Sequence, residues 1–353
     1  MLHHSVDSSL HQDVALSTSS LSSMMEQECT TYSCLDYLNG DDDGRDDGST
    51  TTIYNREHCK SRITPADRMK IVDWCYDIVD QCQFERETVE IAMNIVDRFV
   101  STNHASPSSQ VDALHDRAQY QLVTITALYI SIKLNERVSF GSKDFAAASR
   151  GTYSVEEIED MERNILHGLS WRLCPPTSLQ VGNQILSLML PQVEKTTLEQ
   201  GTWDLIRDEV AFQTENAVRD YYFTTQRPST IATAAIINAI EQVNDQDYEY
   251  LMMALLRVLK DFDFDSYPVL MEARHQLNRL VNEQDESGVV MMSVMTGVST
   301  FEATYNPSDI HNHHSIVHDK LEETMLSYSS SSPRSYSVVS TDSCDDSCAT
   351  VCY

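Results

Sequence analysis

The chain has 353 residues, with 25 Lys and Arg against 54 Asp and Glu, and a formal net charge of −29 at pH 7. A protein this acidic binds nucleic-acid phosphates only through a local basic cluster, and the sequence contains none. Glycine is scarce, at ten residues, and neither GxGxxG nor GxxxxGK[ST] occurs to cradle a nucleotide phosphate. We therefore expect neither a nucleic-acid-binding protein nor a nucleotide-binding enzyme of the usual kinds.

Hydrophobic residues make up 41% of the chain, but no apolar run approaches the roughly 20 residues that span a bilayer. The nine cysteines are scattered and include no CxxC pair, so we expect a soluble intracellular protein without a disulfide framework. Cys344, Cys348 and Cys352 recur every four residues in a Ser- and Asp-rich tail. A solvated stretch without a role is favoured there over a metal or redox site. No cofactor, metal or membrane contact is expected.

Acidic residues are concentrated near the two ends of the chain. Residues 1–60 hold 11 acids and 3 bases, and residues 286–353 hold 9 acids and 2 bases. Both segments are rich in Ser, Asp and Thr and lack sustained hydrophobic periodicity, so they cannot bury enough apolar area to offset chain entropy. We predict a disordered N-terminal tail over 1–60 and a disordered regulatory tail over 286–353.

Hydrophobic residues at spacings of three and four predict consecutive helices over residues 61–174. Thr64 can cap a helix that starts at Pro65, and Ser154 can begin a capping box for a later helix. The stretch 122–134 is apolar nearly all round, which predicts a central helix covered by the others.

Pro175-Pro176 ends this first unit, and helical periodicity resumes in a second unit over residues 175–285. Its apolar stripes cover residues 179–190, 203–222, 231–243, 248–262 and 267–281. No strand pair is predicted, so the fold class is all-α. A central apolar helix in each unit predicts a duplicated domain, with five helices followed by five more.

Several short motifs follow one another between residues 62 and 282. They are Arg68 with Val72-Asp73-Trp74, Asn94 to Phe99, Gln121-Leu122, Ile130 to Glu136, Thr152 to Ser154, Met161-Glu162, Leu169 to Trp171, Pro176-Thr177 and Arg227 to Ala235. In their order and spacing the chain resembles the cyclin family, closest in style to the G1 and D-type members. The resemblance implies two tandem five-helix cyclin folds, with the N-terminal cyclin box at 61–174 and the C-terminal cyclin fold at 175–285.

Lys133 ends an apolar helix, where its ammonium either reaches water or finds carbonyl and carboxylate partners. Glu162, beside Met161, equally fits an ordinary solvated helix position. In cyclins, a Lys and a Glu at these two motif positions bind backbone groups of the partner kinase. The resemblance therefore implies that Lys133 and Glu162, with Leu134, bind a cyclin-dependent kinase.

Two further roles come from the resemblance. Arg68 and Asp97 match the internal ion pair that ties the first cyclin helix to the second. Ile71, Trp74 and Gln121 match a hydrophobic patch that captures peptides of substrates and inhibitors, although Trp74 equally fits a core position.

Two charges are expected to weaken this substrate-docking patch. Asp67 and Lys70 stand where the family commonly has Met and Ile. Charged side chains in an apolar groove disfavour the burial of a peptide, so docking of substrates or inhibitors is expected to be altered or absent.

The tails suggest regulated turnover. No Arg in residues 1–60 has Leu three positions later, so the destruction box of mitotic cyclins is missing there. Ser332-Pro333-Arg334 lies in a tail that resembles the phosphorylation-linked degradation tails of G1 cyclins. The resemblance implies phosphorylation at Ser332, a ubiquitin ligase as a partner, and a nuclear location that extends to the cytoplasm.

The sequence thus predicts a non-enzymatic protein that activates a cyclin-dependent Ser/Thr kinase and controls cell-cycle progression, with G1 or the G1/S step favoured. Three alternatives stay open. A transcription-linked or nutrient-responsive cyclin would share the kinase-binding pair. A TFIIB-like promoter factor would need a basic second repeat, whereas residues 241–249 are acidic. A kinase-independent helical scaffold would need neither Lys133 nor Glu162.

Overall fold

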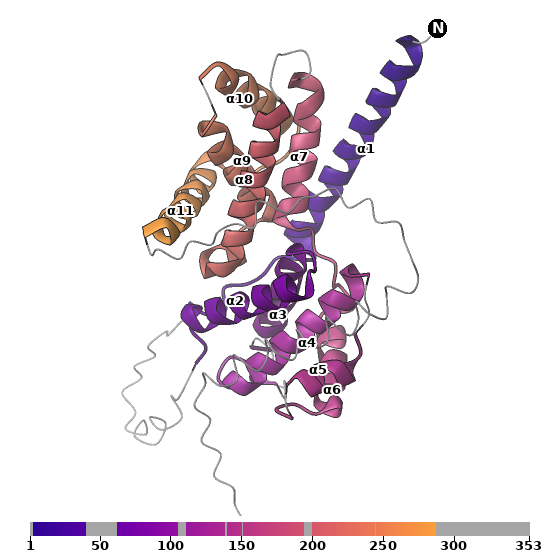
Figure 1. Ribbon diagram of the computed structural model, residues 1–353, viewed down its shortest axis with the longest axis vertical. Helices are drawn as coiled ribbons and strands as arrows, with labels where there is room; N and C mark the ends of the chain where they lie inside the picture. Colours follow the sequence, from indigo (N-terminus) through magenta and orange to yellow (C-terminus); the bar gives the residue numbers. More distant parts are fainter. Residues whose placement is uncertain are drawn as a thin grey trace, which may run out of the picture.

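The structure, a computed structural model, describes residues 3–39, 62–104, 111–137, 140–149, 151–193, 200–243 and 245–286. Every regular element in these ranges is a helix, which confirms the predicted all-α class (Figure 1). Ser332 and the Cys344, Cys348 and Cys352 run lie outside the described residues. None of the helices in these ranges has the length and apolar character needed to cross a membrane.

Five helices form a first group around one hydrophobic core. They are α2 (Pro65–Cys82), α3 (Glu87–His104), α4 (Arg117–Asn135), α5 (Ser142–Ala148) and α6 (Val155–Gly168). The predicted helix starts are confirmed: Thr64 and Ser154 each form a capping box, and Pro65 opens α2. Helix α4 is buried over most of its surface and packs on α3 and α6, as its all-round apolar sequence predicts.

A second group surrounds its own core. It contains α7 (Ser178–Val193), α8 (Gln200–Arg219), the 3₁₀ helix η1 (Tyr221–Thr225), α9 (Pro228–Glu241), α10 (Asp245–Leu259) and α11 (Tyr267–Glu286). Helix α9 is its central element, because α7, α8 and α11 all pack on it and its residues from Ser229 to Ile240 are buried. The two groups interlock, since Val218 and Tyr221 of the second belong to the first core.

The prediction that residues 1–60 form a disordered tail is wrong for residues 3–39. Residues His3–Thr30 form a long helix, α1, that packs against α7 and runs out past the second group (Figure 1). Leu21 and Met25 are buried in the second core, and Glu28 is only 2% exposed. A serine-rich helix is held in place here because a few apolar side chains and the Glu28 carboxylate pack on the second group, and tertiary packing stabilises helices of low intrinsic propensity.

Candidate functional site

The predicted kinase-binding pair is brought together across two helices of the first group. Lys133 lies in the last turn of α4 and Glu162 in α6, and Lys133 Nζ is 2.5 Å from Glu162 Oε1. The ammonium also lies 4.4 Å from the centre of the Tyr129 ring, in a cation–π contact. The Lys133 side chain is 33% exposed and the Glu162 side chain 17% exposed. The pair therefore sits at the surface with part of each polar group open to a partner.

Local structure fixes the direction of both side chains. In α6, Ile158, Met161 and Ile165 are buried against the core, which turns the neighbouring Glu162 toward the end of α4. Helix α4 stops two residues after Lys133, where the Glu136 carboxylate accepts hydrogen bonds from Thr88 Oγ1 (2.6 Å) and the Glu85 amide (3.1 Å). These contacts anchor the end of α4 to the start of α3.

The electrostatics keep Lys133 charged. Partial burial acts to lower the pKa of Lys133, but the hydrogen bond and the charge of Glu162 outweigh it, and the pKa is raised. The negative end of the α4 dipole also favours an ammonium in the last turn. An ammonium has three donors and a carboxylate has two acceptor oxygens, so the pair keeps capacity for a partner's backbone C=O and N–H groups. Leu134, 48% exposed, adds apolar surface beside it.

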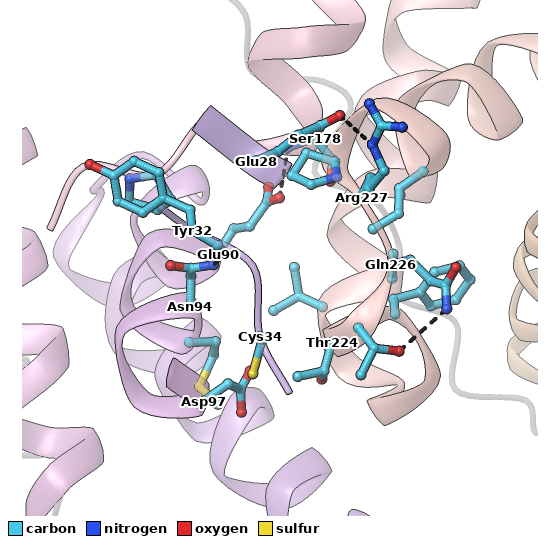
Figure 2. A pocket seen from close by; sticks show the side chains of 18 of the residues that line it. Glu28, Tyr32, Cys34, Glu90, Asn94, Asp97, Ser178, Thr224, Gln226 and Arg227 are labelled. Atoms are coloured by element: carbon cyan, nitrogen blue, oxygen red, sulfur yellow. Dashed lines mark hydrogen bonds and ion pairs between the residues drawn. The ribbon is translucent and has the colours of Figure 1, made fainter. Parts of the chain in front are cut away.

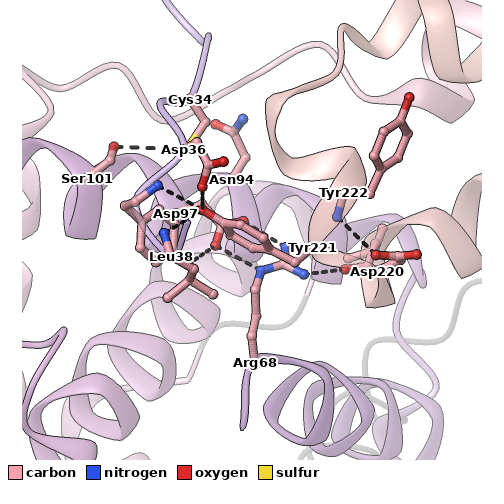
Figure 3. A network of polar contacts seen from close by, with 12 residues as sticks. Cys34, Asp36, Leu38, Arg68, Asn94, Asp97, Ser101, Asp220, Tyr221 and Tyr222 are labelled. Atoms are coloured by element: carbon pink, nitrogen blue, oxygen red, sulfur yellow. Dashed lines mark hydrogen bonds and ion pairs between the residues drawn. The ribbon is translucent and has the colours of Figure 1, made fainter. Parts of the chain in front are cut away.

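Arg68 and Asp97 form a buried ion pair at the joint between the two groups (Figure 3). Arg68 Nε donates to Asp97 Oδ1 (3.0 Å) and Nη2 donates to Oδ2 (2.7 Å), while Nη1 donates to the Val218 carbonyl of α8 (2.7 Å). Burial acts to lower the pKa of Arg68, and the Asp97 charge more than offsets it, so the pKa is raised. The pair links α2 to α3, and through Val218 it also reaches the second group.

The segment that follows α1 completes this joint. Tyr37 is buried, and its hydroxyl donates to Asp97 Oδ1 (2.6 Å). The Tyr221 hydroxyl accepts from the amides of Tyr37 (2.8 Å) and Leu38 (2.9 Å) and donates to Asp36 Oδ1 (2.8 Å). These contacts bind the N-terminal segment to both groups at once.

The residues matched to the docking patch lie at different depths. Trp74 is only 5% exposed and belongs to the first core, with Ile71 packed partly buried against that core. Gln121 accepts a hydrogen bond from the Tyr153 hydroxyl (2.9 Å). Asp67 is engaged at the start of α2, where it completes the Thr64 capping box and pairs with Arg117. The part of Trp74 that a peptide could reach is therefore small.

A cavity of about 100 Å³ lies where α1, α3 and the second group meet (Figure 2). Glu28 of α1 accepts hydrogen bonds there from Arg227 Nε (2.8 Å) and from the Ser229 amide (2.9 Å) and hydroxyl (2.5 Å). Glu90 of α3 accepts from the Ser178 amide at the start of α7 (2.7 Å), and burial raises its pKa to about 7. In the described part of the chain, no group of three or more His, Cys, Asp or Glu side chains could hold a metal ion.

Sequence reasoning missed Glu28, Tyr37 and Tyr221. Val14, Leu21 and Met25 do recur at helical spacing, but they are separated by serines and give a weak signal. The roles of Tyr37 and Tyr221 depend on contacts between segments more than 180 residues apart, which no local pattern reports.

In its described residues the protein is all-helical, with two interlocked helical groups and a partly exposed Lys–Glu pair between α4 and α6. Residues 48–174 match the family described as Cyclin, N-terminal domain. The first helical group lies within this match, so this part of the chain is a cyclin N-terminal domain, which holds the cyclin box.

Curated cyclins are similar to the chain over part of their length. G2/mitotic-specific cyclin-A1 of Caenorhabditis elegans is 27% identical, over 55% of this chain and 36% of that protein. G2/mitotic-specific cyclin-B2 of Oryzias latipes is 28% identical, over 49% of this chain and 40% of that protein. Cyclin-A2 of Xenopus laevis is 26% identical, over 63% of this chain and 50% of that protein. The chain thus spans half or less of these relatives. A solved viral cyclin from herpesvirus saimiri aligns with a TM-score of 0.45 and 12% identity, over 64% of this chain and 88% of that one.

Proposed function

We propose that this protein is a non-catalytic regulatory subunit that binds and activates a cyclin-dependent Ser/Thr kinase. The observation that carries the proposal is the Lys133–Glu162 ion pair, partly exposed beside Leu134 in a cyclin N-terminal domain. A charged pair with spare donors and acceptors beside an apolar side chain suits the backbone and side chains of one partner segment.

The mechanism that follows is a shift in the conformational equilibrium of the kinase. Phosphoryl transfer by a protein kinase needs its own Lys–Glu pair and its activation loop in place. A subunit that binds this arrangement in preference to the inactive one raises its population, and a shift from 1:99 to 99:1 takes about 5.5 kcal/mol of differential binding. An interface of roughly 2,000 Å² or more is large enough to supply this difference.

The test is capture of the tagged full chain from cell extract, followed by an assay of co-purified kinase activity. The double variant Lys133→Ala/Glu162→Ala is expected to lose this activity while its circular dichroism stays helical. The matched control is Asp204→Ala/Arg207→Ala, which removes an exposed ion pair of α8. Unchanged activity in the first variant would show that the pair is not the kinase site and would favour a kinase-independent scaffold.

For cell-cycle timing we propose G1 or the G1/S step. The support is the sequence: residues 1–60 lack a destruction box, and Ser332-Pro333 lies in a Ser- and Asp-rich tail suited to phosphorylation and capture by a ubiquitin ligase. The relatives named above are A- and B-type cyclins, and two of them are named for G2 and mitosis. The test is to measure the abundance of this protein through the cell cycle in synchronised cells. Accumulation confined to G2 and mitosis would contradict the proposal.

The proposed location is the nucleus, with a cytoplasmic pool, on the ground of the family alone. Imaging of a fluorescently tagged chain tests this, and a signal confined to the cytoplasm would count against it.

Identification of the captured kinase by mass spectrometry separates a cell-cycle cyclin from a transcription-linked or nutrient-responsive one.

A further inference from the structure

Helix α10 lies at the outer edge of the second group (Figure 1). Within the described part of the chain, one face of this helix is exposed. Its other face packs on α7 and α9 through Leu251, Ala254, Leu255 and Val258. On the exposed face three large apolar side chains stand in a row: Tyr250 is 61% exposed, Met253 52% and Leu256 52%. Large apolar groups gathered along one exposed helix face are typical of a contact surface.

The residues around this row are arranged symmetrically about Met253. Tyr250 and Leu256 lie three positions before and after it, and the exposed charges Glu249 and Arg257 lie four positions before and after it. The apolar members are thus matched by apolar members, and the acid is matched by a base. The face is therefore complementary to itself when it is turned end to end.

A two-fold axis through Met253, perpendicular to α10, gives this pairing. Each residue then meets its symmetric counterpart in a second copy: Met253 meets Met253, Tyr250 meets Leu256, and Glu249 meets Arg257 twice. A parallel pair in the same register would instead place Glu249 against Glu249 and Arg257 against Arg257, which is repulsive. The charges therefore select the antiparallel arrangement.

We propose that the face of α10 from Glu249 to Arg257 is a self-association surface, on which two copies of this chain pair with their α10 helices antiparallel. The contact rests on one helix face, so it falls at the small end of protein interfaces, below about 1,200 Å² in total. The association is accordingly reversible and concentration dependent. It is independent of the kinase-binding pair, which lies on the first group.

Cysteine cross-linking tests the geometry in the full chain. Only a residue on a two-fold axis meets its own copy closely enough for a disulfide, which needs Cα atoms within about 7 Å. Met253→Cys is expected to give a covalent dimer under mild oxidation, with a peptide linking the two substituted positions in mass spectrometry. Tyr250→Cys alone is the control and is expected to give no such link, whereas an equal mixture of Tyr250→Cys and Leu256→Cys is expected to link across the two proteins.

Identification of the linked peptides separates these products from disulfides of the exposed native residues Cys29 and Cys174. A failure of Met253→Cys to link to its own copy would overturn the proposal. Self-linking of Tyr250→Cys as efficient as that of Met253→Cys would do the same, because it would show contact without the two-fold axis.

Charge reversal tests the pairing by sedimentation over a range of protein concentrations. Glu249→Arg and Arg257→Glu each replace two attractive pairs by two repulsive ones, so each is expected to raise the dimer dissociation constant about five- to tenfold. The double variant Glu249→Arg/Arg257→Glu is expected to recover the parent value. A parent chain that stays monomeric at every concentration, or a double variant weaker than both single ones, would contradict the antiparallel pair.

Discussion

Arg68 and Asp97 face each other through two hydrogen bonds inside the protein, with 3% and 4% of their side chains exposed. Arg68→Ala leaves the Asp97 carboxylate buried without its cation, which is expected to lower the free energy of unfolding by about 3–5 kcal/mol. Urea denaturation followed by circular dichroism measures this loss. Tyr37→Phe removes only one neutral donor from Asp97 and is expected to cost about 1–2 kcal/mol. If Arg68→Ala melts like the parent yet loses kinase binding, the pair is part of an interface and not of the fold.

The contact between Glu28 and Arg227 is expected to hold α1 on the second group. Glu28 is 2% exposed, and Arg227→Ala leaves its carboxylate with Ser229 as the remaining hydrogen-bond partner among the described residues, so a loss of about 3–5 kcal/mol is expected. Adding Glu28→Gln removes the stranded charge and is expected to recover part of that stability. The measurement is a double-mutant cycle in urea, with protease cleavage within α1 as a second readout. Strictly additive losses would show that the two side chains act separately.

Glu90 is expected to make stability depend on pH. Its pKa is raised to about 7 in the folded protein from an ordinary value of 4.5, so between these values the folded state holds a proton that the unfolded state has lost. The contribution of Glu90 to stability therefore falls as pH rises from about 4.5 to 7 and is constant above that.

The variant Glu90→Gln keeps an acceptor for the Ser178 amide and removes the titration. The free energy of unfolding of this variant, relative to that of the parent, is expected to rise by roughly 3 kcal/mol between pH 4.5 and pH 8. Asp208→Asn, at an exposed position of α8, is the matched control and is expected to show no such gain. If the free energies of unfolding of Glu90→Gln and of the parent change with pH in parallel, burial does not raise the pKa of Glu90.

Gly168 ends α6 against the first core. A Cβ atom at this position would lie 3.0 Å from the ring of Phe99, which is 2% exposed. Gly168→Ala is therefore expected to lose about 1–2 kcal/mol to overpacking, although alanine is the better helix former. Gly201→Ala in α8 is the matched control, because nothing lies within 4 Å of its Cβ, and it is expected to be neutral or stabilising. Equal stabilisation by both changes would mean that Phe99 moves aside freely.

Local signals predicted the helices well, and long-range contacts explain what was missed. Thr64 and Ser154 cap helices at the predicted positions because capping depends on residues within four positions. The stretch that forms α5 gave no separate prediction, since seven residues carry too little periodicity. Serines dominate the composition of helix α1, so the sequence predicts a tail there, whereas the residues that hold this helix use partners on α7 and α9.

For the candidate site too, the sequence predicted the residues, and the structure added the contacts between distant segments. The resemblance to cyclins supplied Lys133 and Glu162, and the structure adds that the two bond to each other and that Tyr129 lies under the ammonium. The ion pair of Arg68 and Asp97 was expected to join two helices. Its extension to Val218 depends on how the two groups pack, which periodicity within each group cannot report.

The N-terminal segment also sets a limit on motion. Glu28 is fixed to the second group and Tyr37 to the first, and Tyr37 lies nine positions after Glu28 along the sequence. A chain of that length spans at most about 30 Å when fully extended. While both anchors hold, the segment limits how far the two groups can move apart. A partner that engages both groups would therefore meet them already near their final spacing, with little translational freedom left to lose.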